Sequence, residues 1–284
     1  MSFLDHIHAC NAWDPTGFVP WFLDGERMGR LDLGFADELR RWPGQFRVAP
    51  DAVHWTPTAS DFDGRAQALA EINAVLVAAG VIDHLHGESF PVTAGGRHQA
   101  RLLIDRACAP YFGVRAFGQH LNGFVRGAEG LKLWIGRRSA DRRVCPSQLD
   151  NLVAGGLPWG LGLAENLRKE CREEAGMTPD LADQARSVGA VTYCRGSKRG
   201  LKPDVIYCYD LELPEGFTPC NTDGEVAAFY LWPVEQVLQT VRDTGEFKLN
   251  CNLVIMDFLA RHGYLDQDAP DYLDILQGLR SPLP

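Results

Sequence analysis

The sequence predicts an α/β protein in which a mixed sheet lies between helices, preceded by a smaller α+β unit. Three observations lead to this expectation. Short segments in the C-terminal half have the apolar pattern of strands, and one alternates strictly. Helical stretches bounded by capping or stop residues lie between these segments. The chain has 284 residues, a length compatible with two domains of ordinary size.

Composition restricts the classes of partner and compartment. Hydrophobic residues make up 45% and charged residues 23%, which are globular values. A net charge of −9 argues against nucleic-acid and anionic-membrane partners. The chain has neither an apolar run of about 18 residues nor a secretion signal at its start. Its eight cysteines are scattered without a Cys-x-x-Cys pair, which favours reduced thiols. We therefore expect a cytoplasmic protein.

Residues 1–117 are predicted to form an α+β domain of unassigned role. Phe18 to Leu31 resembles a hairpin, with Asp24-Gly25 as its turn between apolar runs. Helices are expected at Phe35 to Trp42, Gly64 to Ala79 and Gln99 to Phe112. No motif in this part indicates a chemical function.

Residues 118–265 are predicted to form the larger domain. Leu131, Leu133 and Ile135 alternate with Lys132 and Trp134, so the latter two should share the opposite face of the sheet. Strands are expected at His120 to Arg126, Leu131 to Arg138, Ser187 to Cys194, Asp204 to Glu212 and Val226 to Leu231. The basic segment Arg195 to Lys202 is expected to be a loop, either a solvated turn or a phosphate-binding one. Later helices are expected from Pro233 to Val241 and from a cap at Asn250 to a stop at Gly263, with a short helix in the tail, residues 266–284.

The most informative stretch is a glycine-rich loop, Gly155 to Gly162, that leads into a helix over Leu163 to Ala175. Gly176 should end this helix. The row Leu163, Leu167, Cys171 and Ala175 can pack inward. Glycines in such a loop allow close backbone approach to a ligand.

Three carboxylates, Glu170, Glu173 and Glu174, share one face near the end of this helix. They repel one another and face the negative end of the helix dipole, each effect costing roughly 0.3–1 kcal/mol. A hard divalent cation such as magnesium would compensate. The alternative is a solvated face with intrahelical ion pairs of Lys169 with Glu165 or Glu173.

The segment from Gly155 to Met177 resembles the signature of the Nudix hydrolases. That pattern is Gly, five residues, Glu, seven residues, then Arg-Glu-apolar-any-Glu-Glu-any-Gly-apolar. The first glycine and the three later glutamates are present. Lys169 takes the arginine position, and Leu161 stands where the pattern has its first Glu.

Other runs resemble one Nudix branch, described as thiamin pyrophosphokinase-related, which carries an extra N-terminal domain. Asp105-Arg106 in the first part is among the residues similar to that extra domain. Phe18 to Phe22 is similar to that domain as well, and the remaining runs are Gly118 to Phe124, Leu133 to Arg138, Leu149 to Asn151, Glu165 to Leu167, Asp223 to Val226 and Phe258 to Gly263.

The resemblance implies an α/β/α sandwich and a small-molecule diphosphate substrate, cleaved by metal-activated water with Mg²⁺ or Mn²⁺. Branch relatives imply thiamine diphosphate, or its oxidised or damaged analogues, converted to the monophosphate. Glu170, Glu173 and Glu174 would hold the metal, the latter two also being catalytic. Glu225 is the candidate general base or extra ligand, against a plain surface turn.

Five residues are candidates for substrate binding. Gly155 and Gly156 would let backbone amides approach the diphosphate. Trp134 and Trp159 could stack on a flat cationic ring, although core packing is the alternative for Trp134. Arg138 could contact phosphate or form a structural ion pair.

Two other functions stay open at this stage. One is a Nudix hydrolase of another diphosphate, such as ADP-ribose, a nucleotide sugar or a dinucleotide. The other is a non-catalytic ligand-binding module, which Leu161 favours and the three glutamates disfavour. A homodimer is also left open by the sequence.

Overall fold

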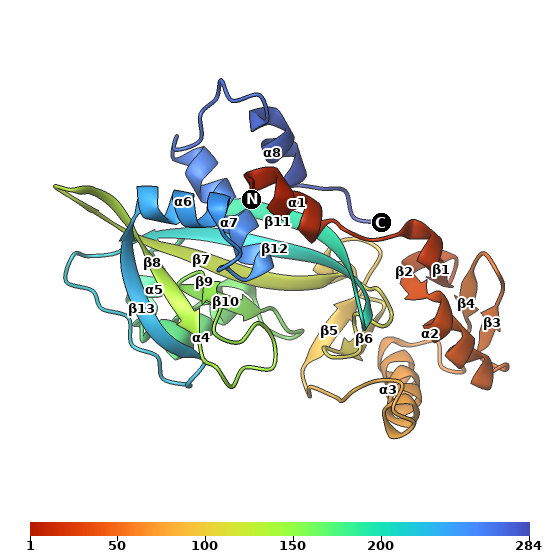
Figure 1. The fold of residues 1–284 in the computed structure, drawn as a ribbon. Coiled ribbons are helices and arrows are strands. Elements are labelled where there is room, and N and C mark those ends of the chain that lie inside the picture. Colours follow the sequence, from red (N-terminus) through yellow and green to blue (C-terminus); the bar gives the residue numbers. More distant parts are fainter.

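A seven-stranded mixed sheet forms the centre of the larger domain (Figure 1). Its strands are β7 (Ala116–Gly127), β8 (Gly130–Arg138), β9 (Leu149–Asp150), β10 (Val153–Gly156), β11 (Arg186–Ser197), β12 (Gly200–Glu212) and β13 (Val226–Pro233). The order is β11-β12-β7-β8-β13, with β10 paired to β7 and β9 to β8. Only β12 and β7 run parallel, so the sheet is mixed as predicted. The computed structural model describes all residues 1–284.

Helices cover both faces of this sheet (Figure 1). They are α1 (Phe3–Cys10), α6 (Val234–Asp243), α7 (Leu249–Arg261) and α8 (Tyr272–Gly278) on one face, and α4 (Leu163–Ala175) and α5 (Pro179–Ala182) on the other. Leu131, Leu133 and Ile135 are buried in the core on the α7 side. Trp134 packs against the core on the α4 side. The predicted alternation and the α/β sandwich are therefore confirmed.

The N-terminal domain contains a second sheet of order β2-β1-β4-β3. The elements of this domain are β1 (Phe18–Leu23), β2 (Glu26–Asp32), α2 (Leu33–Glu38), β3 (Phe46–Val48), β4 (Val53–Trp55), α3 (Phe62–Ala78), β5 (Ser89–Val92) and β6 (Leu102–Asp105), with short 3₁₀ turns at Pro15–Gly17, Leu39–Arg41 and Arg97–Gln99. Asp24 and Gly25 have φ values of 51° and 80°, so they form the hairpin turn that the sequence predicts.

The helix expected at Gln99 to Phe112 is wrong. Leu102 and Ile104 are buried and alternate with half-buried neighbours, which is the period of a strand, and β6 pairs with β5. The Asp105 side chain accepts hydrogen bonds from the backbone of His86, Gly87 and Ala107, which starts a turn directly after the strand. The local bond from Ala107 favours a turn, and the bonds from His86 and Gly87 connect it to a distant segment, where the apolar spacing alone suggests a helix.

Two smaller expectations also need correction. Asn250 lies inside the first turn of α7, whose N-cap is Lys248. The segment Arg195 to Lys202 is the tip of the β11–β12 hairpin rather than a free loop. Its Arg199 forms an ion pair with Asp83 of the N-terminal domain at 2.7 Å.

The first helix packs on the larger domain rather than on the sheet that follows it. Ile7 and Cys10 of α1 belong to the core beneath α7 and α8. The chain then crosses to the N-terminal domain and returns at β7 (Figure 1). No helix combines the length and apolarity that crossing a bilayer requires.

Candidate active site

Helix α4 begins after Gly162 and ends at Gly176, whose φ of 65° allows the left-handed cap. These are the bounds that the sequence predicts. Leu167, Cys171 and Ala175 are buried against the sheet. The preceding glycines differ from expectation, because Gly155 and Gly156 belong to strand β10 and not to a loop.

Two buried amides hold α4 in register with β7 and β10. The Asn166 side chain donates to Gln119 Oε1 at 2.8 Å and to the Gly156 carbonyl at 3.0 Å. Gln119 in turn donates to the Leu163 carbonyl at the start of the helix at 2.9 Å. Sequence reasoning missed both residues as parts of the site, although both lie in runs that resemble the Nudix branch.

Glu170 lies directly against Gly155. A Cβ atom at Gly155 would overlap the Glu170 carboxyl group, so only glycine leaves room for this side chain. Burial raises the pKa of Glu170, and the nearby Lys169 ammonium opposes the shift.

Glu174 is the most buried of the three carboxylates, with 6% of its surface exposed. Its Oε2 accepts a hydrogen bond from the backbone amide of Ala154 at 2.7 Å. Burial raises the pKa of Glu174 to about 8, although this hydrogen bond opposes the shift. The positive charges around Glu174 therefore do not offset the cost of burying its carboxylate.

Glu173 is half-buried, and its Oε2 lies 3.0 Å from Lys169 Nζ. The same ammonium lies 3.1 Å from Glu170 Oε1. The intrahelical pair considered as an alternative is thus present, whereas Glu165 forms no ion pair. The ligand atoms of the three glutamates do not all come within 4.8 Å of one another.

The donor set fits a hard divalent cation. Glu170, Glu173 and Glu174 offer only carboxylate oxygens, which Mg²⁺ and Mn²⁺ prefer. Glu174 is buried and Glu170 is largely buried, both with raised pKa values, while the neighbouring cations Lys169 and Arg172 pair only with Glu170 and Glu173. A further positive charge here would favour their ionised forms.

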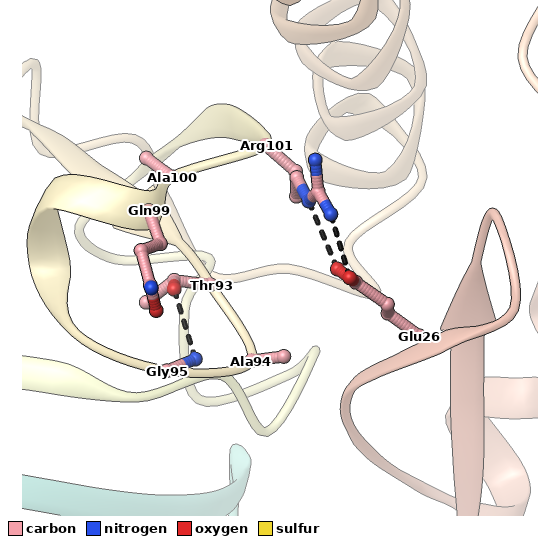
Figure 2. A pocket seen from close by; sticks show the side chains of 7 residues that line it. All are labelled: Glu26, Thr93, Ala94, Gly95, Gln99, Ala100 and Arg101. Carbon is pink, nitrogen blue, oxygen red and sulfur yellow. Dashed lines mark hydrogen bonds and ion pairs between the residues drawn. The ribbon is translucent and has the colours of Figure 1, made fainter.

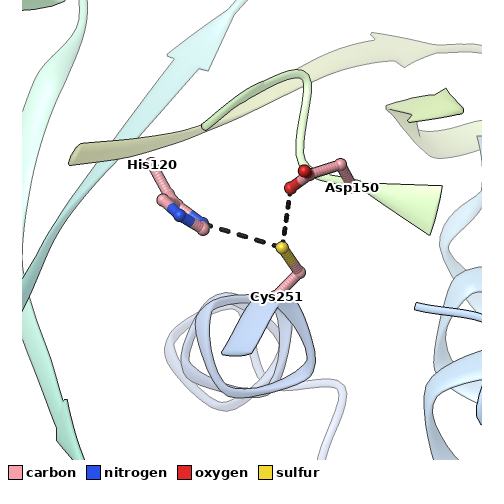
Figure 3. A group of neighbouring side chains, drawn as sticks. All are labelled: His120, Asp150 and Cys251. Atoms are coloured by element: carbon pink, nitrogen blue, oxygen red, sulfur yellow. Dashed lines mark hydrogen bonds between the residues drawn. The ribbon is translucent and has the colours of Figure 1, made fainter. Parts of the chain in front are cut away.

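A second cluster lies on the opposite face of the sheet, where His120, Asp150 and Cys251 meet beside α7 (Figure 3). The Cys251 thiol donates to Asp150 Oδ1 at 2.7 Å, and its sulfur lies 3.9 Å from His120 Nδ1. Asp150 Oδ2 is also bound by Arg138 at 3.0 Å and Lys248 at 3.2 Å.

This second cluster is a satisfied buried network rather than a metal centre. The two cations on Asp150 already neutralise its charge, and His120 Nδ1 is 2.8 Å from Asn151 Oδ1. Burial lowers the pKa of His120 to about 4, so the imidazole is neutral. The sequence showed two of these residues within branch-like runs, but gave no sign that Cys251 joins them.

Arg138 and Trp134, both predicted to bind substrate, have different surroundings. Besides its pair with Asp150, Arg138 donates to the carbonyls of Val144 and Cys145. This is the structural ion pair weighed as an alternative. Trp134 is partly buried on the α4 side, and its indole Nε1 is buried without a hydrogen-bond acceptor.

Glu225 lies in a loop that touches the end of α4. Thr222 in this loop donates from its backbone amide and its hydroxyl to the Glu173 carbonyl, each at 2.9 Å. The Glu225 carboxylate forms an ion pair with Arg142 at 2.7 Å. The loop therefore brings Glu225 to the same end of the helix as the other glutamates, with no direct contact between them.

Trp159 lies between the two domains. Its backbone amide donates to the Ser89 carbonyl at 2.7 Å, and its ring centroid is 5.8 Å from that of Phe62. Arg97, also of the N-terminal domain, donates to the Pro158 carbonyl at 2.9 Å. Sequence reasoning assigned no such role to the N-terminal domain, because contacts between distant segments leave no periodic signal.

The mixed sheet, its two helical layers and the glycine strand beside a carboxylate-bearing helix define a Nudix-type α/β domain with a fused N-terminal domain. Sequence comparison agrees: the family described as "NUDIX domain" matches residues 120–251, and "Domain of unknown function (DUF4743)" matches residues 2–116. Nudix hydrolase 20, chloroplastic, of Arabidopsis thaliana is 39% identical over 291 residues, which cover 99% of this chain and 78% of that protein. Nudix hydrolase 24, chloroplastic, of the same plant is 41% identical over 285 residues, with the same coverage. The chain belongs to the Nudix hydrolase family.

Solved structures with a similar fold include the NUDIX domain of Shewanella oneidensis NrtR complexed with ADP ribose. It is 16% identical, has a TM-score of 0.41, and the match covers 54% of this chain and 91% of that one. A C. elegans Ap4A hydrolase is 15% identical with a TM-score of 0.39, covering 53% of this chain and 99% of that one. The predicted resemblance to Nudix hydrolases with an extra N-terminal domain is confirmed, and family membership implies hydrolase activity.

Proposed function

We propose that this protein hydrolyses a diphosphate linkage in a small molecule with the help of Mg²⁺ or Mn²⁺. The observation that carries the proposal is that Glu174, which is buried, and Glu170, which is largely buried, both contact strand β10 and have raised pKa values. Acids with strongly perturbed pKa values in a desolvated environment cluster at functional sites. The family relationship supports hydrolysis as the reaction.

In this proposal Glu170, Glu173 and Glu174 hold the cation. When bound, a divalent cation neutralises phosphate oxygens and acidifies water. The Ala154 amide fixes the position of Glu174, and Lys169 orients Glu170 and Glu173. Glu225 is our candidate for the general base, because its loop is bound to the end of α4 through Thr222.

Thiamine diphosphate, or an oxidised analogue of it, is our preferred substrate. The reason is the sequence resemblance to the thiamin pyrophosphokinase-related branch, together with aromatic rings at Trp134 and Trp159 that suit a cationic thiazolium. ADP-ribose, nucleotide sugars and dinucleotides are the competing diphosphates.

A substrate panel tests the proposal. Purified protein with magnesium or manganese is incubated with thiamine diphosphate, its oxidised form, ADP-ribose and dinucleotides, and released phosphate or monophosphate is measured. Selective turnover of thiamine compounds is expected. Turnover of a different compound would identify that compound as the substrate instead. No turnover with any compound would favour a non-catalytic ligand-binding module.

Matched glutamine variants test the site itself. We expect Glu173→Gln and Glu174→Gln to lower kcat more than tenfold, because each removes a negative charge from the proposed metal site. Glu165→Gln on the exposed side of the same helix is the control and should retain activity. Near-normal kcat in both site variants would contradict the ligand assignment.

For Glu225→Gln, a pH–rate profile that keeps its acidic limb would exclude the base role.

A further inference from the structure

Arg106 of the N-terminal domain reaches the glycine strand of the larger domain. A Cβ atom built on Gly156 would lie 2.9 Å from the Arg106 Cζ and 3.0 to 3.1 Å from both terminal nitrogens. The flat guanidinium group thus lies against the backbone of Gly156. The Cβ position of its neighbour Gly155 lies against the Glu170 carboxyl group. Because successive residues of a strand face opposite ways, the arginine and the glutamate approach β10 from its two faces.

The guanidinium is anchored on one side only. Nη1 pairs with Glu88 Oε2 at 2.7 Å, and the Cζ atom lies 5.6 Å from the Phe90 ring centroid. Nε and Nη2 have no acceptor within the protein, and 39% of the side-chain surface is exposed. Arg106 is therefore partly exposed and has two donor nitrogens without a protein acceptor, beside the glycine strand.

The surrounding contacts fix this arginine relative to the larger domain. Ser89 accepts from the Trp159 amide, and Arg97 donates to the Pro158 carbonyl. These bonds attach the N-terminal domain to the segment that joins β10 to α4. Arg106 lies just after β6, and its own backbone amide donates to the Glu88 carbonyl at 2.8 Å.

We propose that Arg106 binds a phosphate oxygen of the substrate, so that the N-terminal domain forms one wall of the diphosphate site. This inference rests on the proposed diphosphate function and deepens it. A diphosphate is strongly anionic, and the larger domain offers mostly carboxylates at this place. A guanidinium supplies paired donors whose planar geometry matches phosphate oxygens.

The experiment compares two arginines of the N-terminal domain. Arg106→Ala removes the proposed contact. Arg101→Ala is the matched control, because Arg101 is similarly exposed and is paired with Glu26 at 2.6 Å in a hollow that no residue of α4 lines (Figure 2). Binding of methylenediphosphonate, a diphosphate analogue with a P–C–P bridge that resists hydrolysis, is measured by calorimetry with magnesium present. Thermal unfolding of each variant verifies folding.

We expect Arg106→Ala to weaken binding at least tenfold, Arg106→Lys to weaken it less, and Arg101→Ala to leave it within twofold. Gly156→Ala should resemble Arg106→Ala, because the added methyl group displaces the guanidinium. In the substrate panel the loss should appear mainly in KM.

Three results would overturn the inference: unchanged affinity in Arg106→Ala, an equal loss in both alanine variants, or no binding of the analogue by the wild type. The proposed hydrolysis is tested separately. If no diphosphate is cleaved but binding still depends on Arg106, the hydrolytic function fails and the arginine site stands.

Discussion

At the scale of single residues, Glu174 combines a proposed metal-binding position with a cost in stability. Its pKa is about 8 in the folded protein, compared with an ordinary 4.5. The folded state therefore keeps a proton that the unfolded chain has lost, and stability falls as the pH rises through this interval. Once Glu174 is ionised in both the folded and the unfolded state, the free energy of unfolding is lower by about 5 kcal/mol than at acidic pH.

This gives a prediction for Glu174→Gln, which keeps the shape and removes the charge. In EDTA, urea unfolding should show the wild type losing stability between about pH 5 and 8 relative to the variant. Added magnesium should restore the wild type at the upper end and have little effect on the variant. Parallel pH curves for the two proteins would contradict the assignment of an uncompensated buried carboxyl group.

His120 gives a prediction of opposite sign. Its pKa is about 4 in the fold, below the ordinary 6.5, so the unfolded chain binds the proton first as the pH falls. Stability should decrease from about pH 6.5 to 4 by roughly 3 kcal/mol more than in a His120→Gln variant. Exposed His98→Gln is the control, and its urea unfolding should follow the wild type. An equal acid sensitivity in all three proteins would show that His120 is not the buried neutral group.

At the scale of elements, the sequence was most informative where local chemistry and packing agree. Helix α4 has an inward apolar row and a glycine cap, and the hairpin at Asp24-Gly25 has residues that tolerate positive φ. Prediction failed at β6, where the turn bonds of Asp105 outweigh helical spacing. It also failed at Gly155, whose strand pairing with Gln119 is a long-range choice that local sequence cannot encode.

The role of Gly155 in positioning Glu170 can be tested by Gly155→Ala. The added methyl group overlaps the Glu170 carboxyl group and should displace it, lowering kcat more than tenfold and reducing the rise in the unfolding midpoint that magnesium produces. Gly216→Ala is the control, because no atom lies within 4 Å of its added Cβ and its φ is not positive. A Gly155→Ala protein with a wild-type response to magnesium would show that Glu170 needs no such space.

At the scale of the whole molecule, the two sheets are bound to each other at sites that the sequence did not reveal. Helix α1 packs on the larger domain, while Arg199 of the larger domain pairs with Asp83 of the N-terminal domain. The sequence predicted two units from length and pattern, but side-chain contacts across more than 100 residues carry no periodicity. The bonds of Ser89 and Arg97 add a further connection, at the segment that leads into α4 and the candidate site.

The packing of α1 against the larger domain leads to a prediction about unfolding. Ile7 is buried beneath α8, where a Cβ on Gly278 would meet its Cγ2 atom. Ile7→Ala should lower the free energy of unfolding by about 2–5 kcal/mol, because removing the side chain leaves a cavity in a close-packed core. This loss should appear in the unfolding of the larger domain, although Ile7 lies within residues 2–116, which match the N-terminal family. Unfolding in urea is monitored by tryptophan fluorescence and by circular dichroism.

Exposed His8→Ala on the same helix is the control and should change stability by less than about 0.5 kcal/mol. If the two domains unfold as one cooperative unit, both probes will shift together in Ile7→Ala. A shift confined to a separate transition of the N-terminal domain would mean that α1 contributes nothing to the larger core. In that case the link between the domains would depend on the remaining contacts, which include the Arg199–Asp83 ion pair and the bonds of Ser89 and Arg97 with the segment before α4.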